Sequence, residues 1–265
     1  MGSATREALA TSRAALAASG GTTDLATGES LFSAGRAIGK SSQLLAALAD
    51  PAAEPSAKAT LVRAVFGTNV TAKALTLLEA AASQRWSSHD DLLAGIEDLG
   101  LRATAASAPA GIAIAAELFG FGVTVSSDAE LELALVSKLG RADAKASLVE
   151  ALLVSKVSGQ TLAIVRHLVQ QPRGRRIGEL LRHAASVVAD ASGTTVATII
   201  SASALSAAQL DRLTTSLGER YGRELTVHLV IDESLVGGVR VQIGQDVIDG
   251  SIATRLADLR LQLVR

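Results

Sequence analysis

One segment of the sequence could hold phosphate: residues 35–41, which read Gly-Arg-Ala-Ile-Gly-Lys-Ser. The phosphate-binding loop of nucleotide hydrolases has four residues between its glycines and follows a β-strand. Here three residues separate the glycines, and the segment lies within a helical pattern. We therefore expect no nucleotide-binding loop, and we expect Lys40 to lie at a helix end, where a cation interacts favourably with the backbone carbonyl groups.

Residues that could catalyse a reaction or bind a metal are scattered. The histidines are His89, His167, His183 and His228, and none is spaced from another as a helical zinc site requires. The carboxylate pairs Asp90-Asp91 and Glu97-Asp98 are expected on a solvent-exposed helix without a nucleophile or base. The chain has no cysteine, which excludes disulfides and thiolate metal sites. We predict no catalytic residue, no cofactor and no metal.

The charges of the chain nearly cancel, with 25 basic and 26 acidic residues, and only 2% of the residues are aromatic. Neither nucleic acid nor an anionic membrane surface is therefore an expected partner. One short segment carries an excess of positive charge: Arg173, Arg175 and Arg176 lie close together on a predicted loop. We expect them at the solvated start of a helix, with contact to an acidic partner as the alternative.

Membrane insertion and export are not expected. The longest apolar stretch, residues 110–125, is shorter than the roughly 20 residues that span a bilayer, and it contains Glu117. Residues 1–20 carry Arg6, Glu7 and Arg13 among alanines and lack the apolar core of a secretory signal. We expect a soluble chain.

Helices must position most of these residues. From Thr5 to about Ala191 apolar residues recur every three or four positions, as in Leu61, Val62, Val65 and Phe66. Proline and glycine interrupt this pattern and divide it into short helices, with breaks at residues 20–21, 50–55, 67–69, 107–111 and 171–174.

The helical part contains an internal repeat. Residues 29–84 match residues 116–171 without a gap at an offset of 87, with fifteen identical pairs. Ala57-Lys58-Ala59 corresponds to Ala144-Lys145-Ala146. A biased composition would produce some alanine and leucine matches but not the phenylalanine, glycine and lysine matches. We interpret the repeat as a duplicated helical bundle, with a helix near residues 88–107 running from the first copy into the second.

The pattern changes after Gly193, where β-branched and alternating residues predict strands at residues 196–200, 225–231 and 239–243. We expect the last two to be neighbouring strands joined by a turn. Ser206 and Gln209 form a capping-box signature for a helix between the first two strands. A final helix is expected to start at Asp249 or Ser251. Its apolar face is predicted to comprise Ile252, Leu256, Leu259 and Leu263.

The predicted fold is mainly α: an N-terminal tandem of duplicated helical bundles is followed by a small α+β C-terminal domain. We assign residues 1–107 to the first bundle, residues 108–190 to the second and residues 191–265 to the α+β module. A chain of 265 residues is long enough for each to bury its own core.

Residues 232–241, which read Asp-Glu-Ser-Leu-Val-Gly-Gly-Val-Arg-Val, are followed by Ile-Asp-Gly-Ser-Ile at residues 248–252 and by Leu256. This combination resembles the C-terminal signature of ATP synthase delta subunits and of their mitochondrial relative, the oligomycin-sensitivity-conferring protein. The likeness covers residues 190–265. It is looser in the helical part, where the family has one six-helix bundle and this chain has a duplication.

The resemblance implies a non-catalytic peripheral-stalk (stator) subunit of the F-type ATP synthase, which couples proton-driven rotation to ATP synthesis. It implies a peripheral location on the cytoplasmic side of the bacterial cell membrane. The implied partners are the N-terminal helix of the alpha subunit, held by a bundle, and the C-terminal end of the b subunit, held by the α+β module.

Two sets of residues follow from the resemblance. Candidates for the alpha-binding groove are Leu75, Leu78 and Glu79, or Leu162, Val165 and Arg166 in the second copy; each leucine or valine is equally explained as core. The signature positions, expected to act through backbone geometry, are Gly237, Gly238, Asp249, Gly250 and Ser251.

The repeat alone also permits a stand-alone helical adaptor with no role in ATP synthesis, which the Gly-Gly and Asp-Gly-Ser signature disfavours. An enzyme would need a convergent set of titratable groups that the sequence does not offer.

Overall fold

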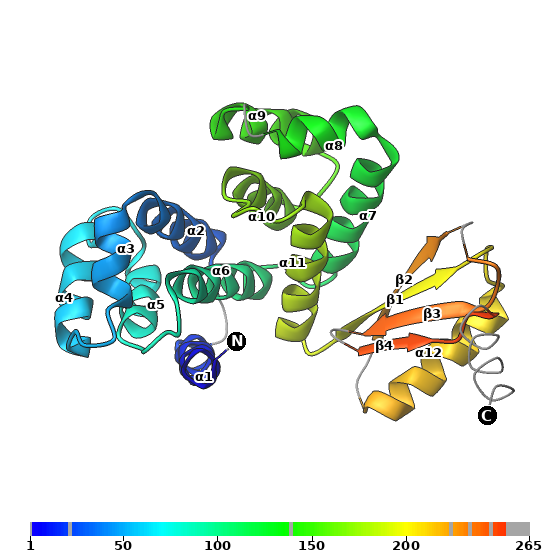
Figure 1. The fold of residues 1–265 in the computed structure, drawn as a ribbon, viewed down its shortest axis with the longest axis horizontal. Helices are drawn as coiled ribbons and strands as arrows, with labels where there is room; N and C mark the ends of the chain where they lie inside the picture. Colours follow the sequence, from blue (N-terminus) through cyan, green and yellow to red (C-terminus); the bar gives the residue numbers. More distant parts are fainter. Residues whose placement is uncertain are drawn as a thin grey trace, which may run out of the picture. The chain divides into compact units, whose positions relative to one another are not determined.

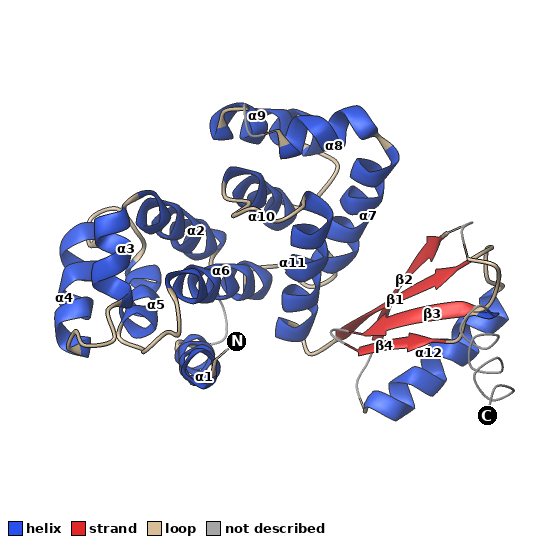
Figure 2. Cartoon of the chain, viewed as in Figure 1, coloured by secondary structure: helices blue, strands red, loops and turns tan. Residues whose placement is uncertain are grey.

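The computed structural model describes residues 2–20, 23–137, 140–222, 225–232, 235–243 and 246–252. The chain divides into two compact units, residues 1–187 and 188–265. Unit 1 is helical, and unit 2 contains a sheet and a helix (Figures 1 and 2). This arrangement confirms the predicted mainly α fold with a small α+β module at its C-terminal end.

The helices that begin in unit 1 are short and close to the predicted boundaries. They are α1 (Ser3–Ala18), α2 (Leu25–Lys40), α3 (Ser42–Ala49), α4 (Pro55–Phe66), α5 (Ala72–Ala82), α6 (His89–Ala106), α7 (Ile114–Ser127), α8 (Ala129–Val136), α9 (Ala142–Leu153), α10 (Gly159–Gln170) and α11 (Ile177–Ala191). Side chains of Asp24, Ser41 and Thr71 accept hydrogen bonds from free N–H groups at helix starts. Lys40 is the last residue of α2, as predicted.

The helix boundaries repeat at the offset found in the sequence. Helices α8 and α9 begin and end 87 residues after α3 and α4, and α10 begins 87 residues after α5. The capping residues repeat as well, because Ser41 corresponds to Asp128 and Thr71 to Ser158. The repeat found in the sequence is therefore also present in the helix boundaries, and the division into bundles of residues 1–107 and 108–190 stays a prediction.

Helix α6 lies at the centre of the first bundle, where it packs along α2 and also contacts α1 and α5. Its buried side chains Leu92, Ile96 and Leu99 join a core that includes Leu31 of α2 and Leu77 of α5. Helix α10 packs on α9 and also contacts α2 and α6. The second set of helices is therefore joined to the first through α2, α6 and α10.

Unit 2 contains β1 (Thr195–Ser201), α12 (Ala207–Tyr221), β2 (Leu225–Ile231), β3 (Val239–Ile243) and β4 (Asp246–Asp249). The strands lie in the order β2-β1-β3-β4; β1 and β2 are parallel, and the other neighbours are antiparallel. The predicted capping box of Ser206 and Gln209 opens α12. The core between α12 and the sheet includes Leu217, Ile199 and Val241.

The prediction that β2 and β3 are neighbours is wrong, because β1 lies between them. Alternating residues indicate a half-buried strand but do not specify its partner. Strand β3 is antiparallel to β1 on one side and to β4 on the other, and the four residues of β4 were too few to stand out in the sequence. Asp249 ends β4, so of the two predicted helix starts only Ser251 directly precedes the helical Ile252. Leu256, Leu259 and Leu263 lie outside the described residues.

Candidate functional site

The first set of groove candidates lies on α5, which packs against α1 and α4. Leu78 is only 1% exposed and belongs to the bundle core. Leu75 is partly buried against the same core. The carboxylate of Glu79 accepts two hydrogen bonds from Arg63 of α4, at 2.8 and 2.9 Å. Leu75 and Glu79 therefore offer the accessible part of this candidate surface.

The second set lies on α10 in equivalent positions. Val165 is fully buried and Leu162 partly buried. Arg166 donates a hydrogen bond of 3.0 Å to Glu150 of α9 and also pairs with Glu29 of α2. Glu150 and Arg166 correspond to Arg63 and Glu79 at the repeat offset, so the ion pair recurs with its charges exchanged. The two copies thus present opposite charges at the same structural position.

A buried charge cluster, comprising Glu97, His167, Arg173 and Arg175, lies between the two sets of helices. Glu97 of α6 is 4% exposed. Its carboxylate accepts hydrogen bonds from Arg173 at 2.7 Å and from Arg175 at 2.8 and 3.0 Å. Nε2 of His167 lies 3.6 Å from Oε2 of Glu97. The cluster links α6 to α10 and to the loop after it.

The protonation states of the buried charge cluster follow from its surroundings. Burial raises the pKa of Glu97, but the contacts with His167, Arg173 and Arg175 outweigh burial and lower it to about 2. Burial lowers the pKa of His167, although Glu97 opposes the shift. Neutral His167 stacks on Phe32, with ring centroids 4.2 Å apart, and its Nδ1 lies 3.3 Å from Nη1 of Arg36. An anionic Glu97 and a neutral imidazole are therefore the stable pair at neutral pH.

Two predictions about charge are wrong here. Glu97 and Asp98 are buried, whereas a solvent-exposed pair was expected. Asp98 accepts hydrogen bonds from Arg13 at 2.7 Å and from Arg102 at 2.9 Å, and paired carboxylates of this kind tolerate burial. Arg173 and Arg175 are not simply solvated, since both bind Glu97. A sequence signal existed, because Glu97 lies four residues from both Leu93 and Leu101 and so shares their helix face.

The signature residues of unit 2 lie close together. Gly237 and Gly238 have φ values of 146° and 83°, which L side chains rarely adopt. A Cβ at Gly238 would lie 2.5 Å from the carbonyl oxygen of Gly250. The N–H of Ile252 donates to Gly237, and that of Gly250 donates to Val239. This geometry supports the expectation that the glycines act through the backbone.

Asp249, the last residue of β4, stabilises the segment that contacts the two glycines. Its carboxylate accepts hydrogen bonds from the N–H of Ser251 at 2.9 Å and from Nε of Arg240 at 3.1 Å. The hydrogen bonds with Ser251 and the charge of Arg240 lower the pKa of Asp249 to about 2. Ser251 is buried. The five signature residues therefore lie in two contacting segments, before β3 and at the end of β4, whereas the six groove candidates lie on two separate helices.

Within the described residues, no three histidine or acidic side chains lie close enough together to hold a metal ion. The same part of the chain contains no helix that is long and apolar enough to cross a membrane.

Comparison with known proteins adds a family relationship. Residues 101–263 match the family model described as "ATP synthase delta (OSCP) subunit". A protein of Leifsonia xyli named ATP synthase subunit delta is 56% identical over 263 residues, 99% of each chain. Proteins of the same name from Kineococcus radiotolerans and Streptomyces coelicolor are 38% and 37% identical, over 89% and 97% of this chain and 87% and 96% of theirs.

A chain in the solved structure of the Toxoplasma gondii mitochondrial ATP synthase hexamer is also similar. The match covers 80% of this chain and 97% of that chain, with 13% identity and a TM-score of 0.40. A TM-score of that size does not establish a common fold.

Proposed function

The chain belongs to the ATP synthase delta (OSCP) subunit family, and from this membership we propose that it joins the catalytic head to the b subunit through two separate contacts. It is a peripheral-stalk subunit of the F-type ATP synthase. The observation that carries the assignment is the 56% identity to a delta subunit along 99% of the chain. The alternative of a stand-alone adaptor rested on the repeat alone, and the family relationship replaces it.

In the proposed mechanism the subunit catalyses no reaction. It resists the torque of rotation by holding the N-terminal helix of an alpha subunit on a helical bundle and the C-terminal end of b on unit 2. An amphipathic helix that buries its apolar face between bundle helices gains affinity without any reacting group. The complex is membrane-bound, and we place this subunit peripherally on the cytoplasmic side.

The alpha contact can be assigned to one copy with matched substitutions. Leu75 and Leu162 are partly buried, occupy equivalent repeat positions and lie on α5 and α10. Leu75→Asp is expected to weaken binding of a synthetic alpha N-terminal peptide by at least about tenfold if α5 lines the groove, with Leu162→Asp as the control. The reverse result would assign the groove to α10. Equal affinity of both folded variants and the unchanged protein would contradict the proposed groove.

The b contact requires a separate experiment. The soluble C-terminal half of b is added to the intact chain, and amide hydrogen exchange is measured along the sequence. Protection is expected within residues 188–252. Protection confined to residues 2–187, or the absence of saturable binding, would contradict the proposed role of unit 2.

A further inference from the structure

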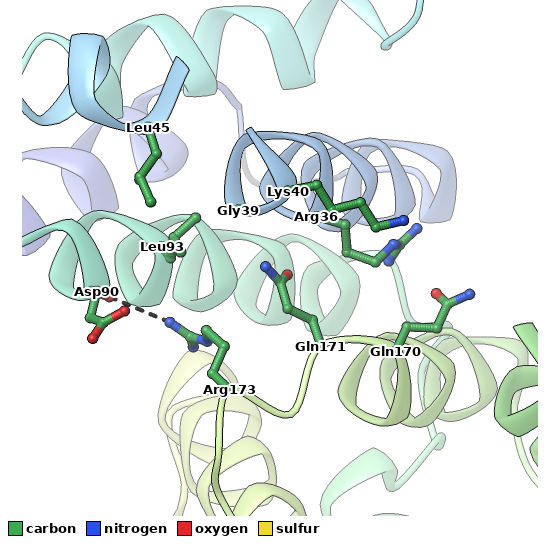
Figure 3. Close-up of a pocket in the computed structure, with 9 residues that line it drawn as sticks. All are labelled: Arg36, Gly39, Lys40, Leu45, Asp90, Leu93, Gln170, Gln171 and Arg173. Atoms are coloured by element: carbon green, nitrogen blue, oxygen red, sulfur yellow. Dashed lines mark hydrogen bonds between the residues drawn. The ribbon is translucent and has the colours of Figure 1, made fainter. Parts of the chain in front are cut away.

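A pocket with a volume of about 460 Å³ opens within unit 1, between α2, the first turn of α6 and the end of α10 (Figure 3). Its size is within the range of small-molecule sites. The residues that line it include Arg36 and Lys40 of α2, Arg173 from the loop after α10, and the amide side chains of Gln170 and Gln171. The pocket therefore gathers three cations and two amides.

The positive charge at one end of the pocket has no direct carboxylate partner. Within the described residues, neither Arg36 nor Lys40 forms an ion pair with a carboxylate. The acidic residue of the described pocket lining, Asp90, is exposed and lies beside Arg173, away from Arg36 and Lys40 (Figure 3). Arg36 and Lys40 are four residues apart on one helix, so their like charges repel each other.

Of Arg36 and Lys40, Arg36 has the higher free-energy cost of burying its charge. It is half-buried, and its Nη1 lies against the neutral ring of His167, which removes none of its charge. Burial and the nearby charge of Arg166 lower the pKa of Arg36, and the charge of Glu29 opposes only part of the shift. The last carbonyl groups of α2 favour the charge of Lys40 at the helix end, but Arg36 lies one turn earlier. An anion in the pocket would compensate for this charge.

The opposite wall has a buried donor without a partner. Nε of Arg173 is buried and has no hydrogen-bond partner in the described structure. The amide of Gln171 donates to the carbonyl oxygen of Gly35 at 3.3 Å. A Cβ at Gly39 would lie 2.5 Å from this amide nitrogen, so the glycine lets Gln171 lie directly on α2.

We propose that this pocket binds a phosphate-type oxyanion, either inorganic phosphate or the terminal phosphate of a nucleotide, with Arg36 and Lys40 as its ligands. A guanidinium group offers a rigid pair of donors that matches phosphate oxygens, and an ammonium group adds a compact charge. The binding mode differs from that of a phosphate-binding loop, because side chains of one helix supply the donors and no glycine-rich loop follows a strand.

Calorimetric titration of the intact protein with inorganic phosphate, and separately with ADP, at constant ionic strength tests the proposal. Saturable binding at one site is expected. Lys40→Gln should weaken it by at least about tenfold, since a hydrogen bond to a charged group contributes that much. Lys40 is exposed, so this variant should keep the fold. The double variant Arg36→Gln/Lys40→Gln should abolish binding.

Lys156→Gln removes the same charge from an exposed position in the loop after α9 and should leave the affinity unchanged. Equal affinities for phosphate and ADP would identify free phosphate as the sufficient ligand, whereas tighter binding of ADP would identify a nucleotide. The proposal is overturned if neither ligand binds saturably, or if Lys40→Gln and Lys156→Gln bind equally well.

Discussion

At the scale of single residues, the most consequential side chain is Glu97. Its carboxylate is buried on α6 and accepts hydrogen bonds from two arginines that lie more than 70 positions later in the sequence. Removing Glu97 from this cluster leaves two partly buried guanidinium groups without a counter-charge, which costs more than the intact cluster contributes. Glu97 therefore holds α6 against α10 and the loop that follows it.

Glu97→Gln is expected to lower the free energy of unfolding of unit 1 by about 3 kcal/mol, because Arg173 and Arg175 lose their counter-charge. Urea denaturation followed by circular dichroism measures the change. Glu132→Gln on α8 is the control, because Glu132 is exposed and should leave the midpoint where it is. An unchanged midpoint for Glu97→Gln would show that the buried charge cluster does not stabilise the unit.

Acid is expected to destabilise unit 1 in two stages. The unfolded chain protonates His167 near pH 6.5 while the folded chain resists, so the stabilisation due to neutral His167 is lost as the pH falls below about 6.5. Ionised Glu97 stabilises the folded state fully above pH 4.5, and this stabilisation is lost as the pH falls toward about 2.

The denaturation midpoint measured from pH 7.5 to pH 5.5 checks the first stage. The decrease should be smaller in His167→Gln. It should not disappear, because burial also lowers the pKa of His183, which contributes to the same loss of stability. A decrease as large as that of the unchanged protein would show that His167 is not the group responsible.

At the scale of elements, short polar signals determine where helices and turns begin. Ser206 and Gln209 start α12, and equivalent capping residues recur 87 positions apart in the two bundles. The turn before β3 depends instead on close backbone approach, because Gly238 lies against Gly250 and Ser251. Loss of a cap leaves one N–H group at the helix start without a partner. A side chain at Gly238 would instead push away the backbone of Gly250 and Ser251.

Gly238→Ala is expected to lower the melting temperature of unit 2 by several degrees, because its Cβ would collide with the Gly250 carbonyl group. Gly193→Ala is the matched control: Gly193 also has a positive φ, 77°, but no atom would lie within 4 Å of an added Cβ. The control should show only the smaller cost of backbone strain. Equal decreases in melting temperature for the two alanine variants would mean that the close approach is unimportant. An unchanged melting temperature in Gly237→Val or Gly238→Val would contradict a structural role of the glycine pair.

Ser206→Ala is expected to destabilise unit 2 by about 1 kcal/mol, because the capping box loses its acceptor for the N–H of Gln209. Thermal unfolding followed by circular dichroism measures the loss. Ser206→Asp should retain most of the stability, since a carboxylate can accept the same bond; an equal loss in both variants would contradict the capping role.

At the scale of the whole molecule, the chain combines helices that repeat at an offset of 87 with a separate α+β unit, as the proposed link between two partners requires. Contacts with two partners reinforce each other, because the first binding event raises the effective concentration for the second. The exchanged ion pairs, Arg63 with Glu79 and Glu150 with Arg166, give the two bundles different charges on equivalent helices. If a bundle holds the alpha helix as proposed, the two copies therefore offer it different charges.

The intact chain is expected to bind a head complex that carries b at least about 100-fold more tightly than it binds either the alpha peptide or the b fragment alone. Surface-immobilised binding assays with each partner measure the three affinities. An affinity for the complex no greater than that for the stronger single partner would contradict simultaneous engagement of the two contacts.

The sequence alone predicts much of the fold, because the relevant signals are local. Each of these signals acts within a few positions: proline and glycine breaks, caps such as Ser206, and periodicity of three to four residues. The structure contains helices where the periodicity predicts them, separated at the predicted breaks. The repeat is also visible by comparison of the chain with itself. Residues 232–241 and 248–252, with Leu256, were sufficient for the resemblance to the delta subunit family, which the family model and the relatives confirm.

Only the tertiary structure determined the pairings between distant segments. The position of β1 between β2 and β3 depends on hydrogen bonds across the sheet, which alternation does not encode. The burial of Glu97 depends on cations brought from a loop far along the chain, and the pocket beside Lys40 exists only because α10 ends against α2. Periodicity determines which face of an element is apolar, whereas the packing of separate elements decides which charges meet there.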